Sequence, residues 1–304
     1  MPEGASITHV PAVSVIVPCY NSERTIRSCL ASILNQRTSI SFEVIVVDSG
    51  SDETGRIVAA EFPAVRLIRL EHRAFPGAAR NVAIRSTNAP YCLMIDSDCV
   101  LKPDVIERMM ARHREGEYAA VGGSLRNGTP RSPSGWIGYL LEFKEFMPST
   151  PRRLVGMVPT ANVMYRRSAV EGAGYFDDRL RASEDTLLNS TIAGSGGIIL
   201  FDPEIEVNHL NRTGWRGVLR YQIALGRSAA LVRKRTGGSG QVLLRHPTLI
   251  ALAPFARLLR AIQWLARHDW KALAVLVCLW PMYLAAASIW AYGFMKGVAS
   301  GESA

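Results

Sequence analysis

Cysteine pairs are missing from this 304-residue sequence. The five cysteines are scattered, with no Cys-x-x-Cys spacing, which argues against a zinc site or a disulfide framework and predicts free thiols in a reducing compartment. They are Cys19, Cys29, Cys92, Cys99 and Cys278.

Glycine-rich nucleotide loops are also missing. No Gly-x-Gly-x-x-Gly follows the first predicted strand, and no Gly-x-x-x-x-Gly-Lys-Ser/Thr loop occurs, so neither the usual dinucleotide site nor a P-loop is expected. Residues 1–12 lack the basic-then-apolar pattern of a signal peptide, so we expect the N-terminus to stay in the cytosol.

Acidic residues are scarce between Asn211 and Lys271, where 12 Lys/Arg accompany the single acidic residue Asp269. The rest of the chain carries 23 basic and 25 acidic residues and is nearly neutral, although the whole chain has a net charge of +9. Nucleic acid could explain such a basic segment, but the apolar run that follows favours a membrane partner and no nucleic acid.

Charge is absent from Ala272 to Met295, a run of 24 residues between two lysines. This length predicts a transmembrane helix over 272–295. The preceding segment Thr248–Trp270 mixes apolar residues with arginines and predicts an interfacial helix, although a second span stays open. The basic excess lies before the span, which places that side in the cytosol.

Strands and helices alternate over the first hundred residues, which predicts a parallel, doubly wound α/β sheet. Ser22 is expected to cap a helix that reaches about Asn35. The predicted elements are strand 13–18, helix 22–35, strand 42–47, helix 55–61, strand 65–70, helix 78–86 and strand 91–95.

The strand Tyr91–Ile95 ends at Asp96-Ser97-Asp98. Because ligands of open α/β sheets bind beyond the carboxyl ends of the strands, both carboxylates are expected at the rim of a site. Two oxygen ligands at this spacing suit Mg²⁺ or Mn²⁺. A turn that merely closes a strand is the alternative.

Two earlier strand ends and one helix carry further polar groups. Tyr20 can stack on a base, Asp48 can accept from a base N–H, and Arg80 can pair with a diphosphate. Each has a structural alternative, as a packing residue, a turn former and a solvated helix charge.

The motifs, in order, resemble those of family 2 glycosyltransferases with the GT-A fold over residues 12–230. They are Pro18-Cys-Tyr-Asn21, Val47-Asp-Ser-Gly-Ser-Asp52, Gly77-Ala-Ala-Arg-Asn81, Asp96-Ser-Asp98, Val158-Pro-Thr-Ala-Asn162, Gly174-Tyr-Phe-Asp177 and Ser183-Glu184-Asp185. The resemblance implies a mixed sheet flanked by helices. It also implies a catalytic domain over 1–235, with a donor half at 12–100 and an acceptor half at 101–235, before a membrane-associated region at 236–304.

The resemblance also implies roles for individual residues. Asp98 would bind Mn²⁺ or Mg²⁺, with Asp96 and His209 as further candidates. Asp185 would be the catalytic base, with Glu184 as acceptor contact or substitute, and Asn162 would border the acceptor pocket. The expected donor-binding residues are Pro18, Tyr20, Asn21, Asp48, Ser49, Arg80, Asp96 and Ser97.

Several residues keep alternatives. Glu184 and Asp185 open a predicted helix, where the dipole would keep a carboxylate ionised with no basic group nearby, or they merely cap it. His209 could equally be a core residue. The basic residues Arg212, Arg216 and Arg220 could close over a diphosphate or face lipid headgroups. The amphipathic, aromatic stripe Trp136–Phe146 is expected in the core, or facing acceptor or membrane.

Together these patterns predict an inverting, metal-dependent hexosyl- or deoxyhexosyltransferase anchored at the cytoplasmic face of the bacterial inner membrane. It would use a nucleotide-sugar donor and a glycan or lipid-linked acceptor in surface polysaccharide synthesis. The alternatives are a nucleotidyltransferase that forms sugar nucleotides, and a non-catalytic sugar-nucleotide-binding membrane protein.

Overall fold

The computed structural model describes residues 10–237 and 241–300. Residues 1–9, which carry most of the prediction about the N-terminus, lie outside this range. The elements are β1 (Val13–Cys19), α1 (Ile26–Leu34), β2 (Phe42–Asp48), α2 (Thr54–Glu61), β3 (Arg66–Arg69), α3 (Pro76–Arg85), β4 (Tyr91–Ile95), β5 (Cys99–Leu101), α4 (Val105–Glu115), β6 (Tyr118–Asn127), α5 (Pro133–Phe143), η1 (Lys144–Phe146), β7 (Arg153–Leu154), β8 (Asn162–Arg166), α6 (Arg167–Gly172), α7 (Glu184–Gly194), β9 (Ile198–His209), α8 (Trp215–Thr236), α9 (Gln241–Arg245), η2 (Pro247–Leu252), α10 (Ala253–His268) and α11 (Trp270–Ala299).

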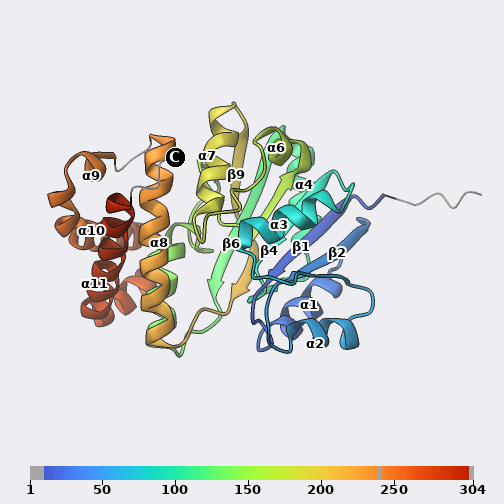
Figure 1. Cartoon of the computed structure of the whole chain (residues 1–304), viewed down its shortest axis with the longest axis horizontal. Coiled ribbons are helices and arrows are strands. Elements are labelled where there is room, and N and C mark those ends of the chain that lie inside the picture. Colours follow the sequence, from blue (N-terminus) through green and yellow to red (C-terminus); the bar gives the residue numbers. More distant parts are fainter. Residues whose placement is uncertain (1–9, 238–240, 301–304) are drawn as a thin grey trace, which may run out of the picture.

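One mixed sheet forms the centre of the molecule (Figure 1). Its strand order is β3-β2-β1-β4-β8-β6-β9-β5, and β7 pairs with β9. The first four strands are parallel, as the alternation of strands and helices predicts. β8 then pairs antiparallel with both β4 and β6. The predicted fold class, a mixed α/β sheet flanked by helices, is confirmed.

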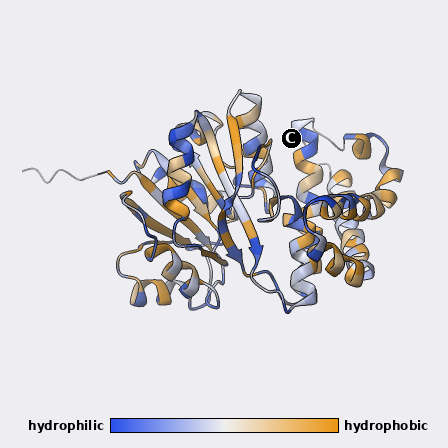
Figure 2. Cartoon of the chain, turned by 180° about the vertical axis from the view of Figure 1, so that it is seen from behind, coloured by the Kyte–Doolittle hydropathy of each residue, from blue (hydrophilic) through white to orange (hydrophobic). Residues whose placement is uncertain are grey.

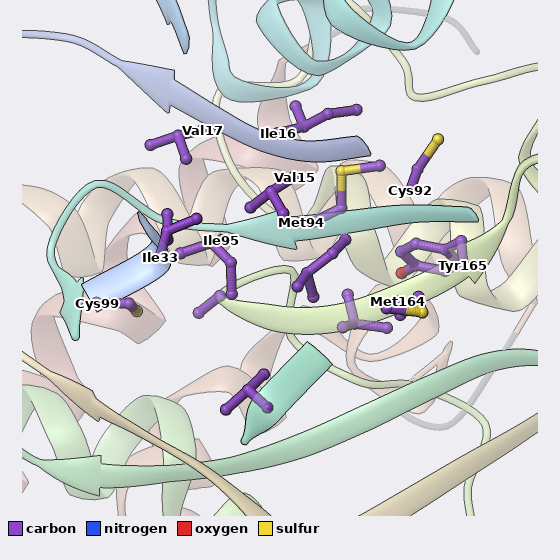
Figure 3. Packing of buried hydrophobic residues seen from close by; sticks show 14 of the residues in the cluster. Val15, Ile16, Val17, Ile33, Cys92, Met94, Ile95, Cys99, Met164 and Tyr165 are labelled. Carbon is purple, nitrogen blue, oxygen red and sulfur yellow. The ribbon is translucent and has the colours of Figure 1, made fainter. Parts of the chain in front are cut away.

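The core lies on both faces of β1, β4 and β8, where apolar side chains pack from each strand (Figure 3). Ile16 of β1, Met94 of β4 and Met164 of β8 are all fully buried. Because helices cover both faces, these strands are apolar runs without polar alternation. The acidic motif that follows β4 is therefore anchored at the middle of the sheet.

Ser22 does not cap α1, contrary to expectation. The helix begins at Ile26 with Thr25 at its N-cap position, and no side chain caps it. The backbone carbonyl of Ser22 accepts from the N–H groups of Thr25 and Ile26, so a tight turn precedes the helix. The Ser22 hydroxyl instead lies 2.8 Å from the hydroxyl of Ser97, which connects the β1 end to the acidic motif.

The C-terminal helices α8 and α11 pack against helices of the preceding part of the chain, α8 against α5 and α7 and α11 against α5. α8 stands between the sheet and the α10–α11 pair, while α5 contacts both the sheet and α11 (Figure 1). Buried side chains of α5, α10 and α11 form one hydrophobic cluster, which includes Leu140, Ala261 and Leu276. The stripe 136–146 is thus largely a core helix, as expected. The domain boundary at residue 235 stays a prediction.

Glycines bring α8 and α11 unusually close. A Cβ added at Gly226 of α8 would lie 2.1 Å from the carbonyl oxygen of Trp290, and one at Gly293 would lie 2.3 Å from that of Ile223. Only glycine permits such backbone approach. The two helices therefore form a tight pair, in which α11 cannot be regarded as a loosely attached anchor.

α10 and α11 nevertheless keep a broad apolar surface. By length and composition, Pro247–His268 and Trp270–Ala299 could each cross a membrane, although core helices of soluble proteins can pass the same test. Only 28% of each apolar window is buried, and exposed side chains such as Phe255, Val277 and Trp280 remain. Figure 2 shows that hydrophobic residues run along the ribbons of these helices. This weakly suggests membrane association.

The close pair predicts a stability difference between two glycines of one helix. Gly226→Ala should destabilise the protein by about 1–3 kcal/mol because the new methyl group overlaps the α11 backbone. Gly217→Ala, also in α8 but facing open space, should leave stability unchanged or slightly raised. Thermal unfolding in detergent micelles measures both, and equal melting temperatures would contradict the described packing.

Candidate active site

A cavity of about 950 Å³ opens at the carboxyl ends of β1 and β4 and continues between α7 and α8. It brings together residues from both halves of the predicted catalytic domain. The sequence-predicted site residues that line it are Pro18, Tyr20, Arg80, Asp96, Ser97, Asp98, Glu184 and Asp185. Of the basic residues predicted to lie near a diphosphate or lipid headgroups, Arg212 and Arg220 also line it, whereas Arg216 does not.

Asn162 does not line the cavity, and the expectation that it borders the pocket is wrong. It is the first residue of β8 and is fully buried. Its amide nitrogen donates to the carbonyl oxygens of Ser124 and Ile205, at 3.1 and 3.0 Å. The side chain therefore points into the sheet and joins β6 to β9, while Thr160 and Ala161 line the cavity instead.

Asn21, Asp48 and Ser49 also lie outside the cavity lining. Asn21 has a left-handed backbone (φ 54°), and its side-chain oxygen accepts from the Ser51 N–H at 2.9 Å. Asp48 is buried and accepts from the Gly50 N–H at 2.9 Å. Burial raises the pKa of the Asp48 carboxyl above its ordinary value. These contacts tie the loops after β1 and β2 together, and a role in donor binding stays a prediction.

Arg80 is a buried cation shared by two carboxylates. Its side chain is 2% exposed and donates to Asp96 Oδ1 and to Glu184 Oε1, both at 2.6 Å. Arg80 was expected to pair with a diphosphate, but its ion pairs are already made within the protein. The expectation of no basic group near Glu184 and Asp185 is wrong for the same reason: Arg80 is 104 residues away in sequence.

The two carboxylates at the start of α7 differ in environment. Glu184 is 5% exposed and bound to Arg80, whereas Asp185 is half-buried, lines the cavity and accepts from the Thr186 N–H at 2.6 Å. Burial raises the pKa of both carboxyls above their ordinary values, although Arg80 opposes the shift. Desolvation therefore outweighs the helix dipole expected to keep them ionised, and Asp185 becomes a stronger proton acceptor.

A candidate metal centre lies beside Asp98. Ligand atoms of Asp98, Cys99 and His209 lie within 4.8 Å of one another. The His209 Nε2 atom is 3.5 Å from Asp98 Oδ1, which is buried and lacks a hydrogen-bond partner among the described residues. An orphaned buried carboxylate oxygen is costly, and a cation would satisfy it.

Asn211 fixes which nitrogen His209 presents. The Asn211 amide nitrogen lies 2.9 Å from Asn127 Oδ1 and 3.1 Å from the His209 carbonyl oxygen, so it donates to both. Its side-chain oxygen therefore faces His209 Nδ1, at 2.9 Å, and accepts a hydrogen bond from the Nδ1–H group. When the ring is neutral, Nε2 therefore carries the lone pair and faces Asp98. Two acceptors that face each other in this way fit a cation.

Cys99 is a less suitable third ligand, because a soft sulfur atom does not match Mn²⁺ or Mg²⁺. Burial, together with the nearby Asp98 carboxylate, raises the pKa of its thiol well above the ordinary value in the metal-free protein. The remaining carboxylate and imidazole donors suit Mn²⁺, and carboxylate oxygen suits Mg²⁺. The residues present thus fit the divalent ion that the sequence predicts.

The sequence alone did not point to Asn211, which contacts His209 but does not line the cavity. It also did not point to two residues that do line the cavity, Arg73 and Glu142. The guanidinium of Arg73 stacks over the Tyr20 ring, 4.1 Å from its centroid, beside the expected base site. Glu142 also lines the cavity, and burial raises its pKa to about 7 while Arg212 and His209 oppose the shift. The available signal was a carboxylate in the amphipathic stripe 136–146, which also contains Lys144 and Glu145.

The mixed sheet and the carboxylate-lined cavity at its strand ends define a GT-A glycosyltransferase. The family model "Glycosyl transferase family 2" matches residues 14–173, and the chain belongs to this family. The predicted family and enzyme class are confirmed.

Named relatives are bacterial. The chain is 33% identical over 175 residues to an N-acetylglucosaminyltransferase of Mesorhizobium japonicum, covering 53% of this chain and 40% of that protein. It is 30% identical over 234 residues to the succinoglycan biosynthesis protein ExoO of Rhizobium meliloti, covering 71% and 65%. The chain thus spans less than two thirds of either relative.

Solved structures share the fold at 20% identity. One is the mannosyltransferase PcManGT from Pyrobaculum calidifontis in complex with GDP-Man and Mn²⁺, with a TM-score of 0.61 over 97% of this chain and 89% of that one. Another is S. aureus TarS 1-349 in complex with UDP-GlcNAc, with a TM-score of 0.54 over 95% and 90%.

The Asn211 contact predicts a loss of metal affinity without loss of a ligand. Asn211→Leu should weaken Mn²⁺ binding about 10–100-fold because His209 is no longer held in the ligating tautomer. Asn211→Asp keeps an acceptor for Nδ1–H and should retain most of the affinity, and Cys99→Ala should bind as the wild type does. Electron paramagnetic resonance titration without donor measures this, and an unchanged Asn211→Leu protein would refute the tautomer argument.

Proposed function

We propose that this glycosyltransferase moves a hexosyl or deoxyhexosyl group from a nucleoside-diphosphate sugar to a hydroxyl of a glycan or lipid-linked acceptor, with inversion. The observation that carries the proposal is one cavity with Asp96 and Asp98 on the sheet side and Asp185 on the α7 side. In an inverting transfer, the diphosphate leaves from one side of the anomeric carbon and the acceptor hydroxyl attacks from the opposite side. Asp96 and Asp98 would serve the leaving side, and Asp185 would serve the attacking side.

The donor half would hold the nucleotide and the cation. Asp98 and His209, with Asp96 nearby, would bind Mn²⁺ or Mg²⁺, which when bound supplies positive charge to the leaving diphosphate. Tyr20 is 43% exposed and stacked by Arg73, which makes a platform for a base or ribose. Pro18 and Ser97 line the same end of the cavity.

Asp185 is the proposed catalytic base. It lines the cavity, and burial makes it more basic than an exposed aspartate. Glu184 is nearly buried and held by Arg80, so it would position α7 and the acceptor rather than take the proton. A single base without a covalent nucleophile fits inversion.

The proposed location is the cytoplasmic face of a bacterial inner membrane. The apolar surfaces of α10 and α11 support it, as does the basic excess that precedes residue 272. A role in surface polysaccharide synthesis is supported by the names of the relatives, one of which is a succinoglycan biosynthesis protein.

Removal of the metal ligand should abolish turnover. Asp98→Asn loses a charged oxygen at the cation site and should remove the Mn²⁺-dependent part of donor affinity. Asp104→Asn, a half-buried aspartate outside the cavity, should not. Asp96→Asn should also be damaging because Arg80 loses a partner. Isothermal titration with a panel of sugar nucleotides measures donor affinity, and full activity in EDTA would overturn the metal role.

Replacement of the base should act on the transition state. Asp185→Asn should lower kcat about 10²–10⁴-fold with donor Kd nearly unchanged. Because burial raises the Asp185 pKa, wild-type kcat should fall as pH drops through a value above the ordinary 3.8, since only the ionised carboxylate accepts a proton. The Asp185→Asn protein should lack that acid limb.

Glu184→Gln separates the base from its neighbour. It should raise the acceptor KM more than it lowers kcat. If Glu184→Gln is inactive and Asp185→Asn is active, Glu184 is the base. If both variants are active, neither residue is the base and both only cap the helix. Nucleoside triphosphate formation from a sugar phosphate would instead indicate a nucleotidyltransferase, and a donor that binds without turnover or hydrolysis would indicate a non-catalytic protein.

A further inference from the structure

The cavity does not end at the catalytic carboxylates but continues along α8. The α8 residues that line it are Gly217, Arg220, Tyr221, Leu225, Ala229, Val232, Arg233 and Thr236. They recur every three or four positions and therefore share one face of the helix. From residue 217 to 236 this face is about 29 Å long at 1.5 Å per residue. The cavity is thus an extended groove, longer than a nucleotide sugar alone requires.

Between Tyr221 and Arg233, the α8 wall of this groove is apolar or small. Leu225, Ala229 and Val232 lie on the α8 side, Ala193 lies on the α7 side, and Trp290 of α11 closes it. A site built for a free glycan alone would need polar groups to meet sugar hydroxyls along this stretch. An apolar chain matches the lining better.

Arg257 of α10 adds a cation to the apolar groove. Its guanidinium stacks over the Trp290 ring, 4.4 Å from the centroid, and one nitrogen donates to the Leu141 carbonyl oxygen at 3.3 Å. The Nε atom is buried and has no hydrogen-bond partner, and no ion pair with a carboxylate is seen for Arg257 in the described part of the chain. Arg233, on α8, lies over the same Trp290 ring at 5.8 Å. The Arg257 guanidinium at the wall of the groove is therefore the group that can pair with an anion.

We propose that this groove binds the acceptor as an amphiphile, a sugar joined through phosphate or diphosphate to an apolar lipid chain. The proposal rests on the proposed function and names its acceptor class. The phosphate pairs with Arg257, the chain lies along Leu225, Ala229 and Val232, and the sugar hydroxyl reaches Asp185. The exposed apolar surfaces of α10 and α11 then adjoin the membrane in which such a lipid resides.

Binding of lipid phosphates to the full-length protein in detergent micelles tests this subsite. The probes are farnesyl diphosphate, farnesyl phosphate and farnesol, titrated calorimetrically in EDTA so that no metal-held diphosphate in the donor half contributes. Farnesyl diphosphate should bind at least about 10-fold more tightly than farnesol, since a charge-assisted pair with Arg257 is lost in the alcohol. Equal affinities would overturn the anionic subsite.

Two arginines of one helix provide a matched pair. Arg257→Gln should weaken farnesyl diphosphate about 10-fold, whereas Arg260→Gln, which does not line the cavity, should leave it unchanged. Ala229→Phe should fill the groove and weaken farnesyl diphosphate but not inorganic diphosphate. If the two arginine variants weaken farnesyl diphosphate binding equally, the binding depends on general surface charge and not on Arg257, and the proposal is refuted.

The donor half supplies the remaining control. Sugar-nucleotide affinity should be the same in wild type and Arg257→Gln, and a loss there would place Arg257 on the donor diphosphate and refute the acceptor subsite. Hydrolysis of sugar nucleotide by the wild type tests the proposed function independently. A protein that binds farnesyl diphosphate through Arg257 but turns over no donor would refute the function and keep the subsite.

Discussion

The buried ion pairs of Arg80 hold the site together. Arg80 comes from α3, Asp96 follows β4 and Glu184 opens α7, so one guanidinium connects the donor side of the cavity to its catalytic side. A charge this deeply buried is stable only while its partners remain, and removal of one partner of a buried pair typically costs about 3–5 kcal/mol. This contact therefore fixes Asp96 and Glu184 relative to each other across one cavity.

Because Arg80 is occupied, its charge is not free to neutralise a phosphate. Asp98 keeps an unpartnered buried oxygen, so the donor side of the cavity is short of a bound cation at this atom, although the Arg212 charge also acts on Asp98. A divalent cation bound by Asp98 and His209 would supply that positive charge on the donor side. The arginines farther along the groove, Arg257 among them, lie where a second anion would be met.

Much of the fold was predictable because its strands are short apolar runs that end in polar groups. Parallel strands buried on both faces need such runs, and their carboxyl ends meet at one edge, which is why Tyr20, Asp96 and Asp98 were found. The errors concern partners that are distant in sequence. The inward direction of Asn162 depends on the antiparallel insertion of β8, and the Arg80–Glu184 pair spans 104 residues. No local pattern encodes either contact.

The C-terminal helices show why one sequence signal can have two structural meanings. Their uncharged length predicts a membrane segment, yet Gly226 and Gly293 bring α8 and α11 into backbone contact, and Trp290 closes the active-site groove. Small residues at a helix crossing serve lipid-embedded and water-soluble helices alike, since both gain from close packing. The apolar outer surface and the groove wall are opposite sides of the same helices. Any membrane that receives α10 and α11 would therefore hold the groove at its surface, where an acceptor with an apolar chain could enter without leaving the lipid.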